Sequence, residues 1–74
     1  MPMAVESFEY LIDRSQSLAY ALRYDPPPIN PLQRARLVFQ LRLAYNLTLN
    51  QCEDTKMSRR LLGLIEECEE LLGS

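Results

Sequence analysis

The residues of this chain that could do chemistry are two cysteines and a group of glutamates near the C-terminus. Cys52 and Cys68 lie 16 positions apart, which is not the Cys-x-x-Cys spacing of a structural zinc site. The acidic group is Glu66, Glu67, Glu69 and Glu70. Neighbouring carboxylates can bind divalent cations or act as general acid and base, provided that they face a shared pocket.

The chain contains no histidine, and this absence limits what these residues can do. Without an imidazole it lacks the usual base near neutral pH and the commonest zinc ligand. Neither a Ser-His-Asp nor a Cys-His nucleophile system can be built from one chain, and the two glycines, Gly63 and Gly73, cannot form a phosphate-binding loop. We therefore expect no enzymatic activity, no catalytic residue, no metal and no cofactor.

The composition predicts one small globular domain over residues 1–74. The chain is 47% hydrophobic with a net charge of −2, which is too apolar for a disordered segment. With tyrosine counted as polar, its longest apolar runs, such as residues 37–39, are three residues long, whereas a membrane helix needs about 20. Because no signal peptide is recognisable, we expect a cytoplasmic protein without membrane contact. Both cysteines are then free thiols, with Cys68 in the core.

The elements that must position these residues are all helical. Apolar residues recur with helical spacing over about 3–24, and an amphipathic helix is expected there. A proline-rich connector follows at 25–31, through which no α-helix can run. Asn30, Pro31 and Gln33 then resemble a capping box with proline at the first helical position. The second helix therefore begins at residue 31 and is expected to extend to about residue 50.

A third helix is expected over about 55–72, with one narrow apolar stripe that includes Met57, Leu61 and Cys68. Gly73 suits the position that follows a helix end. Four glutamates in the last turns lie at the negative end of the helix dipole, which is unfavourable. We expect arginines of another helix or of another chain to lie beside them.

The junction at residues 50–55 leaves two folds open. Asp54 can cap a new helix, and the chain is then an all-α three-helix bundle. Neither glycine nor proline interrupts the junction, however, and the stripe of the third helix continues the phase of one side of the second. The alternative is therefore a helical hairpin with one long C-terminal helix of about 40 residues, roughly 60 Å long.

The second helix is apolar on two opposed sides, so both sides must be covered. In either fold, one short chain has more apolar surface than its own helices can hide. Self-association solves this, and a two-fold dimer is the commonest form. The residues expected to self-associate are Leu32, Phe39, Leu43, Leu47, Met57 and Leu61.

One face of the first helix carries residues typical of protein interfaces. Tyrosine and arginine are over-represented at binding hot spots, and this face predicts contacts with a larger protein through Tyr10, Arg14, Tyr20 and Tyr24. We interpret the chain as a non-enzymatic interaction module, a small adaptor or regulator that acts through helix surfaces and self-association. A structural subunit of a larger assembly is another possibility.

A DNA-binding regulator is the alternative from another class. Residues 48–66 resemble the helix-turn-helix pattern of phage-repressor-like regulators, which implies a recognition helix that opens with Ser58, Arg59 and Arg60. The run departs from that pattern: the turn glycine is absent, polar residues replace the small one, and the spacing is one residue short. Residues 31–50 have a net charge of +3, but their arginines point in different directions around the expected helix, whereas binding to a phosphate backbone favours a single basic face. The sequence thus disfavours nucleic acid as a partner.

Overall fold

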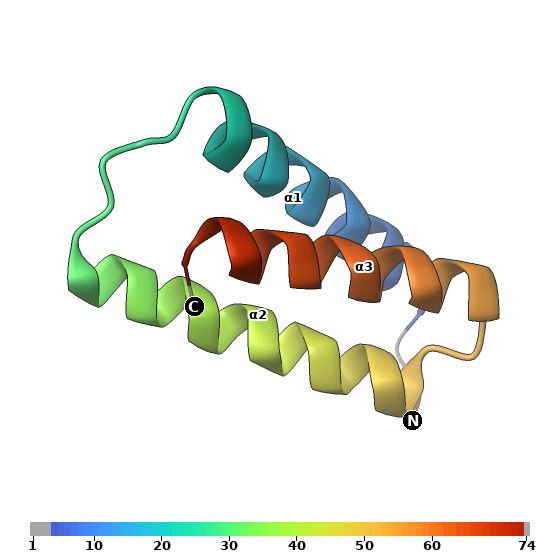
Figure 1. Ribbon diagram of the computed structural model, residues 1–74. Helices are drawn as coiled ribbons and strands as arrows, with labels where there is room; N and C mark the ends of the chain where they lie inside the picture. The colour runs from blue at the N-terminus through green and yellow to red at the C-terminus, as the bar shows by residue number, and fades with distance from the viewer. Residues whose placement is uncertain (1–3, 74) are drawn as a thin grey trace.

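The computed structural model describes residues 4–73, which form three α-helices (Figure 1). α1 comprises Val5–Tyr24, α2 comprises Pro31–Gln51 and α3 comprises Thr55–Leu71. The prediction of an all-α chain of three helices is therefore confirmed. The helix ends agree with the predicted ones to within one residue, apart from the predicted start at residue 3, which lies outside the described residues. None of these three helices is long and apolar enough to cross a lipid bilayer.

The start of α2 is held by a complete capping box. The side-chain oxygen of Asn30 accepts a hydrogen bond from the Gln33 backbone N–H at 2.8 Å, and the Gln33 side chain accepts one from the Asn30 N–H at 3.0 Å. Pro31 occupies the first helical position, where its missing N–H removes no helical hydrogen bond. The start of α2 thus follows from residues that are adjacent in the sequence.

The chain turns between α2 and α3, so the predicted alternative with one long C-terminal helix is wrong. α2 ends at Gln51, and Cys52 has an extended backbone. The Asp54 carboxylate then accepts a hydrogen bond from the Met57 backbone N–H at 3.0 Å and caps α3. This cap satisfies an N–H group that has no partner within the helix, and it stabilises the break without any glycine or proline.

α3 is the central helix of the bundle. It packs against both α1 and α2, whereas α1 and α2 contact each other far less. Figure 1 shows that α3 is parallel to α1 and antiparallel to α2. Leu61, Ile65 and Cys68 of α3 are completely buried. The remaining buried apolar residues are Phe8, Ile12 and Ala19 of α1, Leu41 of α2, and Leu72.

α2 is covered on one side only. We expected both of its apolar sides to need cover, but the helix that has neighbours on two sides is α3. In α2 only Leu41 and Thr48 are buried, and the Thr48 hydroxyl donates to the Ala44 carbonyl at 2.7 Å. Leu49 is 57% exposed. The single chain therefore leaves one apolar side of α2 in water.

The glutamates at the end of α3 lie beside basic side chains of both other helices. Arg23 of α1 is 2.9 Å from Glu67, and Arg42 of α2 is 3.7 Å from Glu69. Arg34 of α2 donates to the Gly73 carbonyl at 3.2 Å. The expectation that arginines of another helix offset the unfavourable dipole is confirmed. Each such surface pair contributes about 0–1 kcal/mol to stability. Their main effect is therefore to fix the position of the C-terminal end of α3 relative to α1 and α2.

Candidate protein-interaction surfaces

The first candidate surface is a row of large apolar side chains on the outside of α2, which we call the outer row. Its members are spaced four to seven residues apart, which places them on one side of the helix. The exposed fractions are 64% for Leu32, 64% for Phe39, 49% for Leu43 and 37% for Leu47. Single exposed leucines are ordinary on protein surfaces, but four large apolar side chains on one side of a helix mark a candidate contact surface.

Two residues that the sequence grouped with the outer row lie elsewhere. Leu61 is completely buried in the core of the chain, and Met57 is half-buried against that core. Leu61 is therefore not available to a second molecule and is removed from the self-association surface, whereas Met57 presents only part of its side chain. The grouping relied on a helical phase that runs on from α2 into α3, and the turn at 52–54 interrupts that phase.

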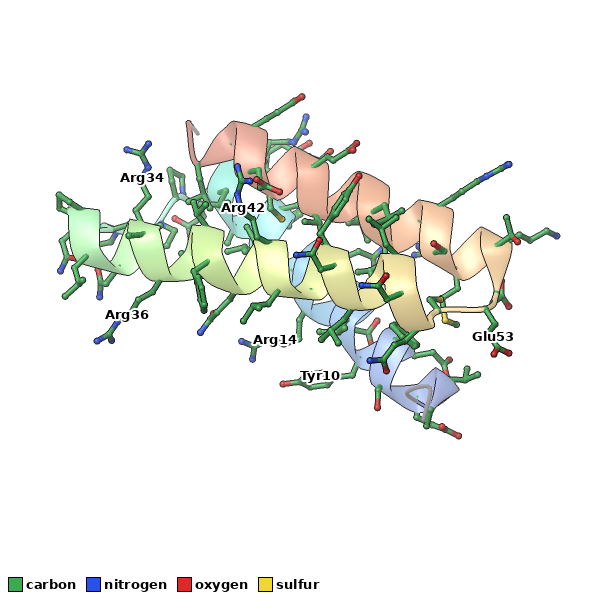
Figure 2. All side chains as sticks on the ribbon, turned by 90° about the horizontal axis from the view of Figure 1, so that it is seen from below. Tyr10, Arg14, Arg34, Arg36, Arg42 and Glu53 are labelled. Carbon is green, nitrogen blue, oxygen red and sulfur yellow. The ribbon has the colours of Figure 1, made fainter. Side chains whose placement is uncertain are left out.

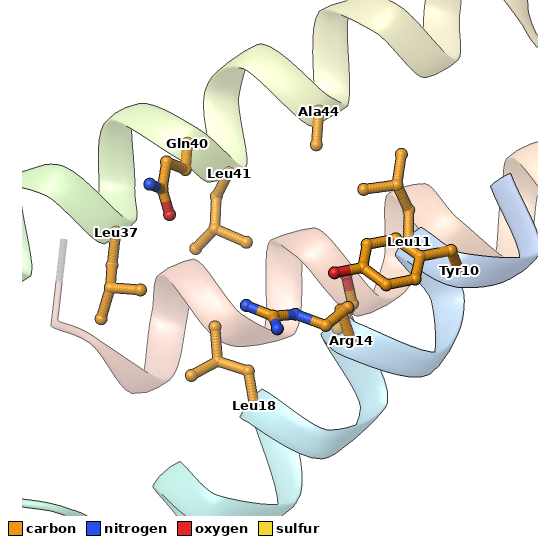
Figure 3. A pocket seen from close by; sticks show the side chains of 9 residues that line it. Tyr10, Leu11, Arg14, Leu18, Leu37, Gln40, Leu41 and Ala44 are labelled. Carbon is orange, nitrogen blue, oxygen red and sulfur yellow. The ribbon is translucent and has the colours of Figure 1, made fainter. Parts of the chain in front are cut away.

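The second candidate surface is a groove between α1 and α2, which contact each other far less than each contacts α3. Figure 3 shows Arg14 and Leu18 of α1 facing Leu37 and Leu41 of α2 across it. One part of the groove has a volume of about 240 Å³, with Tyr10 and Gln40 also in its wall. The adjoining part, of about 370 Å³, shares Leu18, Leu37 and Gln40 with the first and continues to the proline-rich connector.

The four residues expected to bind a larger partner fall into two pairs on different parts of α1. Tyr10 and Arg14 lie together at the groove, with the Arg14 guanidinium 5.9 Å from the centre of the Tyr10 ring. Tyr20 and Tyr24 pack on each other with ring centres 4.9 Å apart. This second pair lines a separate depression beside Leu64 and Glu67 of α3. The structure thus connects only Tyr10 and Arg14 with the groove.

The thiols and carboxylates do not form a shared site. Cys52 and Cys68 are both free. The Cys68 thiol is buried and donates to the Ser15 carbonyl at 3.4 Å. Burial raises its pKa from 9.0 to about 11, and the nearby Glu67 carboxylate adds to the shift. Such a thiol is a packing residue and a poor nucleophile at neutral pH. Within residues 4–73, no three acidic, cysteine or histidine side chains gather as metal ligands.

The residues of the DNA-binding alternative lie at the start of α3. Arg59 and Arg60 are exposed, and Ser58 is half-buried. In a helix-turn-helix the two helices cross at about 90–120°. Figure 1 shows α2 and α3 running side by side in opposite directions, which is the arrangement of a helical hairpin. The geometry gives the DNA-binding interpretation no additional support.

Neither the groove nor the exposed charges of Arg36 and Glu53, toward the two ends of α2, was predicted from the sequence. A signal for the groove was present, because Leu11, Leu18 and Leu22 lie toward one border of the apolar face of α1. That border is half-buried in the folded chain, whereas the centre of the face contacts α3.

No known protein family, curated protein or solved structure matches the chain.

Proposed function

We propose that this protein is a non-enzymatic interaction module that self-associates through the outer row of α2. The observation that carries the proposal is the exposure of Leu32, Phe39, Leu43 and Leu47, between 37% and 64%, along one side of a helix whose other side is packed. Covering these side chains removes apolar surface from water, at roughly 25 cal/mol for each Å² buried.

A second copy of the chain is the occupant that the size of the protein favours. A domain of 74 residues buries a modest share of its surface and gains from oligomerisation. Closed two-fold dimers are the commonest oligomers, and they use the same patch on both subunits. An interface made by one helix face is smaller than a standard protein interface, which buries about 800 Å² on each partner. We therefore expect a reversible dimer with a micromolar dissociation constant.

The groove at Tyr10 and Arg14 supplies the adaptor part of the proposal. The part of the groove beside Tyr10 and Arg14 lies between α1 and α2 rather than on the outer side of α2, so a dimer formed through the outer row leaves that part open. A half-covered apolar floor with an aromatic and a cationic side chain at its edge is typical of protein contact sites. The Tyr10→Ala and Arg14→Ala variants should dimerise as the natural chain does. Loss of the dimer in either variant would place the groove inside the dimer interface instead.

The experiment that tests self-association is a charge placed within the outer row. Phe39→Glu should turn the dimer into a monomer, as measured by size-exclusion chromatography with light scattering, because dimerisation would bury an unpaired carboxylate. The matched control is Leu49→Glu, since Leu49 is similarly exposed on another side of the same helix. It should leave the dimer intact. If both variants dimerise equally well, the outer row is not the interface.

A further inference from the structure

The charges around the outer row bear on whether two copies of α2 can pair in a parallel or an antiparallel orientation. α2 contains three arginines and no acidic residue. Two of them are used within the chain, because Arg34 donates to the Gly73 carbonyl and Arg42 pairs with Glu69. Arg36 is exposed and has no hydrogen bond or ion pair with any residue between 4 and 73. It is therefore the arginine of α2 that is left for a second molecule.

An exposed carboxylate lies at the other end of the same helix. Glu53 follows α2 in the turn that leads to α3, and no described residue hydrogen-bonds or ion-pairs with it. Figure 2 shows Arg36 near the N-terminal end of α2 and Glu53 just beyond its C-terminal end. The apolar residues Phe39, Leu43 and Leu47 lie between them. Along α2, an exposed arginine thus precedes these three apolar residues and an exposed carboxylate follows them.

This arrangement of charges is complementary to that of a second copy whose α2 runs in the opposite direction. In a two-fold pair, the patch on one subunit must fit the same patch on the other. A parallel pair would bring Arg36 next to the partner's Arg36, and like charges repel. An antiparallel pair brings Arg36 next to the partner's Glu53. Opposite charges then meet at both ends of the interface.

The helix dipole favours the same orientation. α2 has no acidic residue in its first turn and no basic residue in its last turn, so neither end of its dipole is offset by its own side chains. In an antiparallel pair, Arg36 of one copy lies at the C-terminal end of the partner's α2. It supplies there the positive charge that the last turn lacks.

The spacing of the apolar residues fits this arrangement when the two-fold axis passes near Leu43. Phe39 and Leu47 each lie four residues from Leu43, about 6 Å along the helix, so Phe39 packs against the partner's Leu47. Arg36 lies seven residues from Leu43 and reaches the level of the partner's Asn50. The partner's Glu53 follows within the length of an arginine side chain. Resting on the proposed self-association, we propose that two copies pair antiparallel through α2, with Arg36 of each subunit against Glu53 of the other.

The test is a charge exchange measured by sedimentation equilibrium at low ionic strength. Arg36→Glu and Glu53→Arg each replace two attractions by two repulsions, so each should raise the dimer Kd by about tenfold. The double variant R36E/E53R restores opposite charges and should return the Kd to within about twofold of the natural value. Mixing the two single variants should also give a heterodimer that is tighter than either homodimer.

The control variant is Arg59→Glu, which makes the same charge change as Arg36→Glu at an exposed position of α3. It should leave the Kd unchanged, and all variants should keep the helical circular dichroism of the natural chain. A dimer whose Kd is the same after either single exchange, or is not restored in the double variant, would overturn the antiparallel pairing while leaving self-association standing. A natural chain that stays monomeric would overturn both.

Discussion

Leu41 and Leu43 lie two residues apart on α2 and have opposite surroundings. Leu41 is 7% exposed and belongs to the core, whereas Leu43 is 49% exposed in the middle of the outer row. Two residues along a helix amount to about half a turn, so the pair samples the packed side and the open side of the same helix. The contrast allows the stability of the chain and its association to be tested separately.

Leu41→Ala should lower the free energy of unfolding by about 2–5 kcal/mol, because it leaves a cavity among packed side chains. Leu43→Ala should change the stability of the monomer by less than about 0.5 kcal/mol and should weaken the dimer. Urea denaturation at a protein concentration below the dimer Kd measures the first effect, and sedimentation measures the second. Equal destabilisation of the monomer by both substitutions would show that Leu43 is also packed within the chain.

The capping box predicts a specific role for Asn30. Its side chain accepts a hydrogen bond from Gln33 at 2.8 Å, so Asn30→Ala should lower the free energy of unfolding by about 1 kcal/mol. In a domain of this size, thermal unfolding should then move down by about 4–8 °C. Asn46→Ala is the control, since Asn46 is an exposed asparagine in the interior of α2 and should change little. A smaller loss of stability in Asn30→Ala than in Asn46→Ala would contradict the role of Asn30 as a helix cap.

The two glycines should respond in opposite directions to the same substitution. Gly63 lies inside α3 with open space around the position of a Cβ atom, so Gly63→Ala should stabilise the chain by about 0.5–1 kcal/mol. Gly73 follows α3 with a φ of +76°, and Gly73→Ala should destabilise the end of the helix by about 1 kcal/mol. Thermal denaturation of both variants checks the pair. Stabilisation by both would mean that the end of α3 does not need the left-handed conformation.

The raised pKa of Cys68 predicts how stability changes in alkali. The native thiol keeps its proton up to about pH 11, whereas an unfolded chain loses it near the ordinary value of 9.0. The folded state therefore binds more protons between these values, and its stability falls as pH rises from 9 to 11, by about 2 kcal/mol for this group. Cys68→Ala should show a shallower fall than the natural chain between pH 8 and 11. An identical slope would contradict the shift.

The same burial predicts that the two thiols differ in reactivity. Cys52 is half-buried at the end of α2, and Cys68 is completely buried. Iodoacetamide at pH 8 should alkylate Cys52 in the native protein and should reach Cys68 only after unfolding. Peptide mass spectrometry distinguishes the two sites. Equal labelling rates in the native protein would show that Cys68 is not shielded by Ser15 and its neighbours.

The helices and their ends could be predicted from the sequence because the interactions that set them are local. The residues of the capping box at Asn30 and Gln33 are three apart, and Gly73 directly follows the last turn of α3. The end of α2 was harder to predict. The cap at Asp54 stabilises a break there, but the residues of the junction are also compatible with a continuous helix.

The sequence could not predict which helix is central. An apolar pattern shows that one face of a helix must be covered, but it does not show which other helix covers that face. α2 has the larger apolar surface, yet α3 has the completely buried residues Leu61, Ile65 and Cys68. The narrow stripe of α3 is covered by two helices, and α2 then keeps only one neighbour. For the same reason Leu61 was expected at a contact surface although it lies in the core, whereas Leu32, Phe39, Leu43 and Leu47 are exposed on one side of α2.

The most direct test of the central claim is the mass of the natural chain in solution as a function of concentration. Sedimentation equilibrium from about 1 to 500 μM spans the range expected for a small interface. With self-association, the mass should rise reversibly from the chain mass of 8.6 kDa to twice that value. A single species of 8.6 kDa at every concentration would contradict self-association, because the outer row of α2 would then remain in water by itself.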